Sequence, residues 1–159
     1  MYDFFIKFRV DTLLDVESLI SEELMKYVTC DVEIKIYGYV INSQNVFDKI
    51  IDNEVNGKSL NSGIYGKYTI FYVNYKNQKI IVESDHFGGY KNVYYTRKDN
   101  YYYIFSSIKY IKSDGSKIKF NYDIVNEFIY NGVIKTKDTL FCGIYRLLPS
   151  ESIVVKNSN

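Results

Sequence analysis

The sequence predicts an α+β fold in which antiparallel strands are flanked by helices. Between residues 67 and 107, four apolar or alternating runs are separated by short turn sequences, which is typical of an antiparallel β-meander. Apolar residues at helical spacing occur near both ends of the chain, over 13–28 and again over 121–132. Such an order favours a layered α+β architecture, and 159 residues fit one domain spanning 1–159.

The first third of the chain is predicted to form strand, helix, strand and helix. Residues 2–10, "YDFFIKFRV", alternate apolar and polar side chains as a half-buried strand does. Residues 13–28 carry a single apolar stripe on an otherwise charged helix. Residues 31–41 return to the strand period, and a short amphipathic helix follows over 45–54.

A glycine-rich loop containing Gly57, Gly63 and Gly66 then leads into the strands of the meander. A later helix begins near Asn121 and ends at Gly132, a residue type that commonly terminates helices. The predicted strands of this second part are 67–75, 79–84, 92–97, 101–107 and 151–156.

Composition and charge exclude several classes of function. The net charge is +1 and the basic residues are scattered singly, whereas a nucleic-acid surface needs clustered positive charge. No apolar run reaches the length of a membrane span, and the N-terminus lacks the pattern of a signal peptide. We therefore expect a cytoplasmic protein with no nucleic-acid and no membrane partner.

The residues that could bind a metal or act as thiol nucleophiles are few. Cys30 and Cys142 lie far apart in the sequence, and His86 is the only histidine, so no metal site is predicted. Two such cysteines in a cytosolic protein are expected to be reduced and partly buried.

Two stretches, residues 66–111 and 127–155, contain a series of short motifs in a fixed order. Together they resemble the second half of the glutamine-amidotransferase domain of asparagine synthetases, over a little more than half of the chain. The resemblance implies the N-terminal-nucleophile (Ntn) fold, a four-layer αββα sandwich with two antiparallel sheets. The first stretch opens at Gly66, and the residues that match the motifs are Asp85, Phe87, Gly88, Tyr94, Tyr95, Phe105, Ser106, Ser107, Ile108, Lys109, Thr139, Leu140, Phe141, Gly143, Ile144, Leu147 and Pro149.

The same resemblance implies that the chain lacks the catalytic residues of the family. Active members begin Met-Cys-Gly, and removal of Met exposes a Cys whose thiol attacks the glutamine amide while its own amino group serves as base. This chain begins Met1-Tyr2-Asp3. The segment that forms the oxyanion hole corresponds to residues 37–42, where Gly38 and Asn42 remain and Tyr37 replaces the Asn donor. The Arg-His-Arg-Gly-Pro and Gly-Ser-Asp loops that hold the substrate have no counterpart, so no catalytic residue is assigned.

The remaining polar residues receive structural interpretations. Asp85 is predicted to accept backbone N–H groups in the turn before Gly88, and neighbouring His86 is expected to have a structural or surface role rather than a catalytic one. Ser106 ends a strand without an evident base, and Lys109 is expected to be solvated. Cys142, in an apolar stretch, is expected to be a buried, inert thiol.

These observations lead to three alternative functions. The first is a non-catalytic amidotransferase-like domain that docks a pyrophosphate-loop ATPase (synthetase) domain, in the same chain or in another protein. ATP and Mg²⁺ would bind only that synthetase, and the resemblance to lasso-peptide cyclases and β-lactam synthetases suggests a peptide substrate for it. The second is an active amide hydrolase that uses Cys30 exposed by processing, or Ser106 or Cys142. The third is a free-standing scaffold or regulatory protein.

Overall fold

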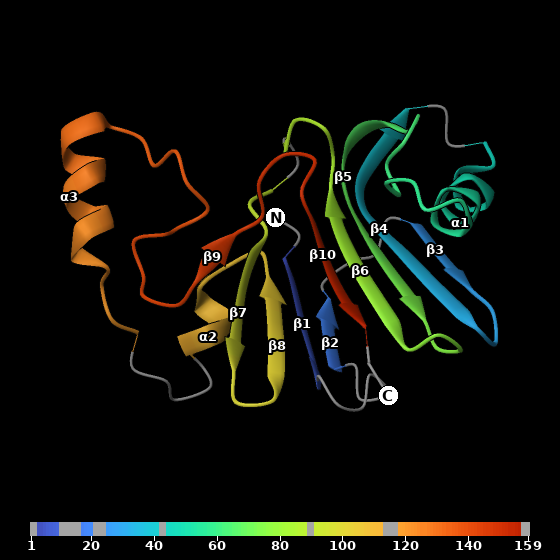
Figure 1. Cartoon of the computed structure of the whole chain (residues 1–159), viewed down its shortest axis with the longest axis horizontal. Coiled ribbons are helices and arrows are strands. Elements are labelled where there is room, and N and C mark those ends of the chain that lie inside the picture. Colours follow the sequence, from blue (N-terminus) through green and yellow to red (C-terminus); the bar gives the residue numbers. More distant parts are fainter. Residues whose placement is uncertain are drawn as a thin grey trace.

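A computed structural model describes residues 3–9, 17–20, 25–41, 44–88, 91–112 and 118–156. Over these residues the chain has a mixed α+β fold built on two antiparallel sheets, as the sequence predicts (Figure 1). The two sheets contain five strands each, and three helices accompany them within the described ranges.

The first sheet, sheet A, joins the start of the chain to the second half of the meander. Its strand order is β2-β1-β8-β7-β9. β1 pairs with β8 in a register that places Phe5 opposite Phe105 and Arg9 opposite Tyr101. Its strands are β1 (Phe4–Arg9), β2 (Glu17–Ile20), β7 (Tyr94–Lys98), β8 (Tyr101–Phe105) and β9 (Tyr145–Arg146).

The second sheet, sheet B, has the strand order β10-β6-β5-β4-β3. Its centre is the long β4–β5 pair, in which Val32 lies opposite Asn74 and Ile41 lies opposite Tyr65. Its strands are β3 (Met25–Val28), β4 (Val32–Ile41), β5 (Tyr65–Asn74), β6 (Lys79–Ser84) and β10 (Ser152–Lys156).

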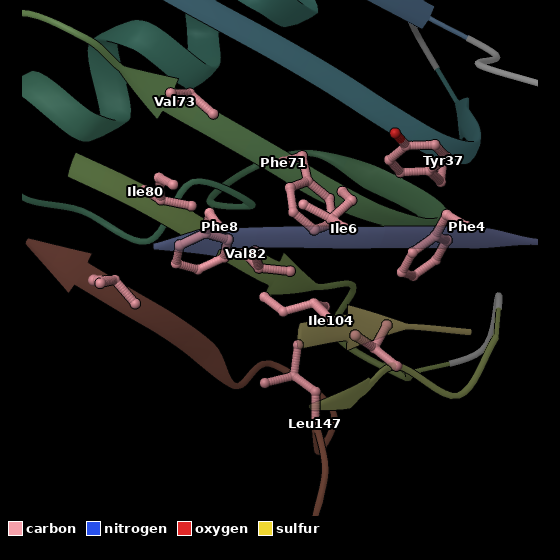
Figure 2. Packing of buried hydrophobic residues seen from close by; sticks show 12 residues of the cluster. Phe4, Ile6, Phe8, Tyr37, Phe71, Val73, Ile80, Val82, Ile104 and Leu147 are labelled. Carbon is pink, nitrogen blue, oxygen red and sulfur yellow. The ribbon is translucent and has the colours of Figure 1, made fainter. Parts of the chain in front are cut away.

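The main hydrophobic core lies between the two sheets (Figure 2). Phe4, Ile6 and Phe8 of β1 face Phe71 and neighbouring side chains of sheet B, in agreement with the alternation predicted for residues 2–10. The Phe4 and Phe71 rings meet edge to face at 6.0 Å between centroids. Each such side chain, fully buried, stabilises the fold by about 1.5–3 kcal/mol, so this core fixes the start of β1 against sheet B.

A second core covers the other face of sheet B. Helix α1 (Val46–Val55) packs Val46 and Ile50 against that face, where they meet the buried side chains of β4 and β5. The helix predicted over 45–54 is thus confirmed. On the outer face of sheet A, Ile111 of the four-residue helix α2 (Lys109–Lys112) joins a third, smaller cluster.

Helix α3 (Tyr122–Asn131) confirms the predicted third helix but buries none of its residues. It stands to one side of both sheets in Figure 1. Gly132 ends the helix in the left-handed conformation, φ 71°, and its N–H donates to the carbonyl of Phe128 at 2.8 Å. Asn121 occupies the predicted N-cap position of the helix, but its side chain makes no capping hydrogen bond.

The helix predicted over residues 13–28 is wrong in the described parts of that segment. Residues 17–20 and 25–28 form the edge strands β2 and β3. β3 pairs with β4, with Met25 opposite Ile36, and its alternate residues Met25 and Tyr27 pack into the core under α1. Pairing with a long strand therefore outweighs the local helical spacing.

Candidate functional site

Four polar side chains gather at the N-terminal end of β1, and we call this cluster the β1 corner: Asp3, Lys91, Ser106 and Lys109. Asp3 immediately precedes β1, Ser106 follows β8, and Lys109 begins α2. The Lys109 ammonium donates to Oδ2 of Asp3, and Nζ of Lys91 lies 3.4 Å from its Oδ1. The pairing of β1 with β8 brings these residues together across about a hundred positions of sequence.

In the β1 corner, the interactions between side chains keep Asp3 negatively charged and Lys109 positively charged at neutral pH. The hydrogen bond from Lys109 lowers the pKa of the Asp3 carboxyl; burial opposes this, and Lys91 adds to the lowering. The same bond raises the pKa of the Lys109 ammonium. A general base works best when its pKa lies near the working pH. The pKa values of Asp3 and Lys109 are both shifted away from neutral pH. The β1 corner therefore holds an ion pair and not a general base suited to catalysis.

The Ser106 hydroxyl is used to join β1 to β8. Its oxygen accepts the N–H of Phe4 at 2.9 Å, and it lies 3.4 Å from both the Phe4 carbonyl and Oδ1 of Asp3. The Ser106 N–H donates to the Phe4 carbonyl at 3.0 Å. These contacts account for Ser106 as a strand-closing residue. The sequence predicted that Lys109 would be solvated; it is exposed but ion-paired.

The Asp85-His86 sequence forms a turn, and the two side chains do not pair with each other in it. Asp85 is 1% exposed; its Oδ1 accepts the N–H of Phe87 at 2.8 Å and its Oδ2 accepts that of Tyr68 at 3.2 Å. His86 is exposed, with Nδ1 3.1 Å from Oγ of Ser150. These contacts confirm the predicted turn role of Asp85, and they place His86 at the surface.

Two motifs that are far apart in the sequence meet at this turn. Gly88 has φ 59°, and a Cβ added there would lie 3.1 Å from Cγ of Pro149. The Ser150 N–H donates to the Asp85 carbonyl at 3.0 Å, and the Ser84 hydroxyl donates to that of Leu148 at 2.7 Å. Phe87 itself is 81% exposed. The Asp85 and Pro149 motifs therefore form one structural unit at the end of β6.

Gly38 and Gly66 lie where the backbones of the paired strands β4 and β5 approach each other closely. A Cβ on Gly38, φ 119°, would stand 2.1 Å from the Lys67 carbonyl oxygen, and one on Gly66, φ 149°, would stand 2.2 Å from that of Tyr39. The adjacent Tyr37 ring is buried against Phe4, 5.0 Å between centroids. Backbone packing thus explains why Gly38 is glycine, without an oxyanion hole. Asn42 lies outside the described residues.

The tyrosine and Gly143 positions belong to the sheet A edge. Tyr94 stacks on Phe105 at 5.9 Å, and Tyr95 lies 5.6 Å from Tyr145, centroid to centroid. The Thr96 hydroxyl donates to the Gly143 carbonyl at 2.6 Å. These residues attach the segment after α3 to β7, so they contribute to the fold and not to the β1 corner.

A family model for the glutamine amidotransferase domain matches residues 50–159, well over half of the chain. The chain belongs to this glutamine amidotransferase domain family. A comparison with curated proteins finds no match. The family match includes every position from Gly66 to Pro149 that the sequence motifs single out, whereas Asp3 and Gly38 precede it. It therefore covers three members of the β1 corner and leaves out the residue that carries its negative charge.

In the described part of the amidotransferase domain, Glu83 is the centre of a buried polar cluster that the sequence motifs did not reveal. Glu83 is 2% exposed, and its carboxylate accepts the N–H groups of Leu60 and Asn61 at 3.1 and 3.0 Å and the Ser59 hydroxyl. It thereby secures the loop between α1 and β5. The available signal was a carboxylate inside the apolar strand "KIIVES", but its partners lie more than twenty residues away.

The cysteine prediction needs correction, because both thiols of this amidotransferase domain are exposed. Cys142 lies in a turn rather than in the apolar core, and its Sγ lies 3.3 Å from the Phe120 carbonyl oxygen. Cys30 lies in the bend between β3 and β4. Within the described ranges, no group of three His, Cys, Asp or Glu side chains could hold a metal ion. The helices of those ranges are also too short and too polar to cross a bilayer.

Proposed function

We propose that this glutamine amidotransferase-family domain does not hydrolyse glutamine and instead docks an ATP-dependent synthetase domain that forms amide bonds. The observation that carries the proposal is the β1 corner. In the resemblance to asparagine synthetases, the N-terminal Cys nucleophile stands at this end of the chain. Here Asp3 lies directly before β1, with its carboxylate bound by Lys109 and Lys91. An ion-paired carboxylate is a poor nucleophile toward an amide, because lysine ammonium groups balance its charge and its oxygens already accept hydrogen bonds.

The other candidate nucleophiles support the same proposal. The Ser106 hydroxyl oxygen accepts a hydrogen bond from the Phe4 N–H. The Lys109 ammonium of the same corner is kept protonated by its hydrogen bond to Asp3. His86, a residue that could serve as base, contacts Ser150 at a different turn. Among the described residues, the only carboxylate at the Ser106 hydroxyl is the ion-paired Asp3, so we do not expect acyl transfer through Ser106.

The fold is compatible with a docking role, because the two-sheet frame is present in the described residues and could support a partner domain. The two stacked sheets, with α1 outside one and α2 outside the other, suit the four-layer Ntn arrangement. Members of the asparagine synthetase family that close amide bonds without glutamine, such as β-lactam synthetases and lasso-peptide cyclases, use an amine already present in the substrate. We place this domain with them, in the cytoplasm, with ATP and Mg²⁺ on the synthetase and a peptide as its substrate.

The experiment has two arms. In the first, the chain is expressed with the pyrophosphate-loop ATPase encoded next to it or after it, and the pair is purified through a tag on the ATPase. Stoichiometric recovery and amide formation with ATP, without glutamine consumption, are expected. In the second arm, the chain is incubated with a thiol-reactive glutamine analogue and its intact mass is measured. An unmodified mass is expected, whereas an adduct or a chain shortened to Cys30 would support the hydrolase instead.

A further inference from the structure

A small pocket lies between α2, β7 and the segment that joins α3 to β9, and we call it the β9 pocket (Figure 1). Its volume is about 160 Å³. A cavity of nearly that size holds benzene, so the β9 pocket suits a ligand of about six to nine non-hydrogen atoms. Apolar side chains and two charged ones line it: Ile108, Ile134, Leu140 and Phe141, with Asp138 and Arg146.

The guanidinium of Arg146 is fixed in this pocket by the backbone. Its Nε–H donates to the Thr136 carbonyl at 3.0 Å, and its Nη2 donates to the Ile134 carbonyl. No carboxylate of the described residues forms an ion pair with it. A guanidinium that is held in place and keeps further N–H groups is suited to bind the two oxygens of a carboxylate.

The carboxylate of Asp138 lines the same pocket without contacting that guanidinium. Its Oδ2 accepts the Thr136 hydroxyl at 2.9 Å, and no cationic side chain of the described residues forms an ion pair with it. The backbone keeps the two charges close, because Asp138 forms a β-bridge with Tyr145 and the Arg146 N–H donates to the Lys137 carbonyl at 2.8 Å. Two opposite charges that share a pocket without pairing are complementary to a zwitterion.

The four apolar side chains of the lining determine what else the ligand carries. We call them the apolar wall, and Phe141 is supported there by Phe120, with ring centroids 5.4 Å apart. The neighbouring Thr139 hydroxyl is already used within the fold, since it donates to the Ile144 carbonyl at 2.7 Å. A charged group placed against the apolar wall would lose its water without a partner, whereas an aliphatic group gains from burial.

We propose that the β9 pocket binds a free α-amino acid with an aliphatic side chain of the size of valine or leucine. The α-carboxylate lies on Arg146, the α-ammonium on Asp138 and the aliphatic group against the apolar wall. Such ligands have eight or nine non-hydrogen atoms, which agrees with the volume of the pocket. The site is separate from the β1 corner, and the proposal does not depend on the docking function.

The first test is isothermal titration calorimetry of the intact chain with L-leucine. We expect saturable binding with a Kd between about 10 μM and 1 mM, the range that a ligand of this size reaches with modest efficiency. Leucinamide, which lacks the carboxylate, should bind at least about tenfold more weakly. L-Alanine should also bind at least about tenfold more weakly, because most of the aliphatic group is missing.

N-Acetyl-L-leucine distinguishes a free amino acid from the C-terminal residue of a peptide, which offers the same carboxylate and side chain. It has no ammonium for Asp138, so we expect at least about tenfold weaker binding. Binding as tight as that of L-leucine would show that Asp138 does not contact the ligand, and would contradict the proposal.

The second test changes the charges of the pocket. Asp138→Asn keeps an acceptor for the Thr136 hydroxyl but removes the negative charge, so L-leucine should bind about tenfold more weakly. Asp123→Asn makes the same change at an exposed position of α3 and should bind as wild type does. Arg146→Gln should weaken binding at least about tenfold, with Arg97→Gln at an exposed position of β7 as its control.

Arg146 also contacts two carbonyl groups, so the urea unfolding midpoint of Arg146→Gln is measured beside its affinity. If that variant is unfolded, Asp138→Asn decides the question. Absence of saturable binding of L-leucine and of L-valine to wild type up to about 10 mM would overturn the proposal. So would equal affinity of wild type and Asp138→Asn. Neither result bears on the docking of a synthetase, which is argued from the β1 corner.

Discussion

Two polar regions of this domain use carboxylates in opposite ways. In sheet B, Gly38 and Gly66 allow a close approach between the paired strands β4 and β5, while Glu83 and Asp85 are buried and accept backbone N–H groups. We call these four residues the sheet B frame. In the β1 corner, Asp3 is partly exposed and accepts from lysine ammonium groups. Backbone partners hold loops in one conformation, whereas lysine partners fix charge at a surface.

This difference indicates which of the motif residues stabilise the fold. Buried carboxylates are costly unless every oxygen is satisfied, so their removal leaves unpaired N–H groups inside the protein. Ion pairs at a surface contribute little, because water and salt screen them. Changes to the sheet B frame should therefore destabilise the domain clearly, and changes to the β1 corner should have little effect on its stability.

The largest effect is expected for Gly38→Ala. The added Cβ would collide with the Lys67 carbonyl oxygen, and φ 119° is unfavourable for any residue with a Cβ, so we expect a loss of more than about 3 kcal/mol in the free energy of unfolding. Gly57→Ala is the control, since Gly57 also has positive φ, 65°, but open space around it. It should cost only about 1–2 kcal/mol. Urea unfolding measures both, and equal losses would show that the approach of β4 to β5 at Gly38 is not tight.

The next effect is expected for Asp85→Asn. The amide keeps one acceptor oxygen, so either the Phe87 N–H or the Tyr68 N–H faces an NH₂ group, and we expect a loss of about 2 kcal/mol. Asp52→Asn makes the same chemical change on the exposed side of α1 and should remain within about 0.5 kcal/mol of wild type. A neutral result for Asp85→Asn would remove the distinction between the two regions.

A smaller effect, visible in its pH dependence, is expected for Glu33 of β4. Burial raises the pKa of its carboxyl, but the Tyr75 hydroxyl at 2.7 Å and the ammonium groups of Lys35 and Lys26 outweigh this and lower it. A lowered pKa adds stability above the ordinary value of 4.5, and this stability is lost as the pH falls below it. Glu33→Gln should cost about 1 kcal/mol at pH 7, after allowance for solvent screening, and progressively less as the pH falls below 4.5. A constant difference across that range would contradict the assignment.

The smallest effect is expected for Asp3→Asn in the β1 corner. The substitution removes the ion pairs with Lys109 and Lys91 but keeps a hydrogen-bond acceptor, so the free energy of unfolding should change by less than about 0.5 kcal/mol. Thermal unfolding at low and high salt measures the change. A loss as large as that of Asp85→Asn would mean that the β1 corner also holds the fold.

The sequence predicted much of the fold, because local patterns and pairing agree over most of the chain. The meander from 67 to 107 became β5 to β8, and α1 and α3 formed where apolar residues recur at helical spacing. Residues 17–20 and 25–28 were mispredicted as helix, since edge-strand pairing with β1 and β4 is a tertiary effect that helical periodicity does not reveal. Two-residue β9 was also missed, because it exists only by pairing with β7.

The candidate site was less predictable than the fold. The turn role of Asp85 followed from its place before glycines, a local signal. The partners of Glu83 and Asp3 are not local: Ser59 is 24 residues from Glu83, and Lys109 is 106 residues from Asp3. Such contacts require the sheet topology to be known first. The exposure of Cys142 was likewise missed, because its apolar neighbours line a groove at the surface instead of entering a core.

The most direct test of the central claim is the release of glutamate from glutamine by the purified chain, alone and with its synthetase partner. We expect no release above that of the heat-denatured chain, at any pH from about 6 to 9, for wild type and for Asp3→Asn alike. Sustained glutamate release by wild type that disappears in Cys30→Ala, Cys142→Ala or Ser106→Ala would contradict this claim, and would show that this amidotransferase domain has kept a nucleophile.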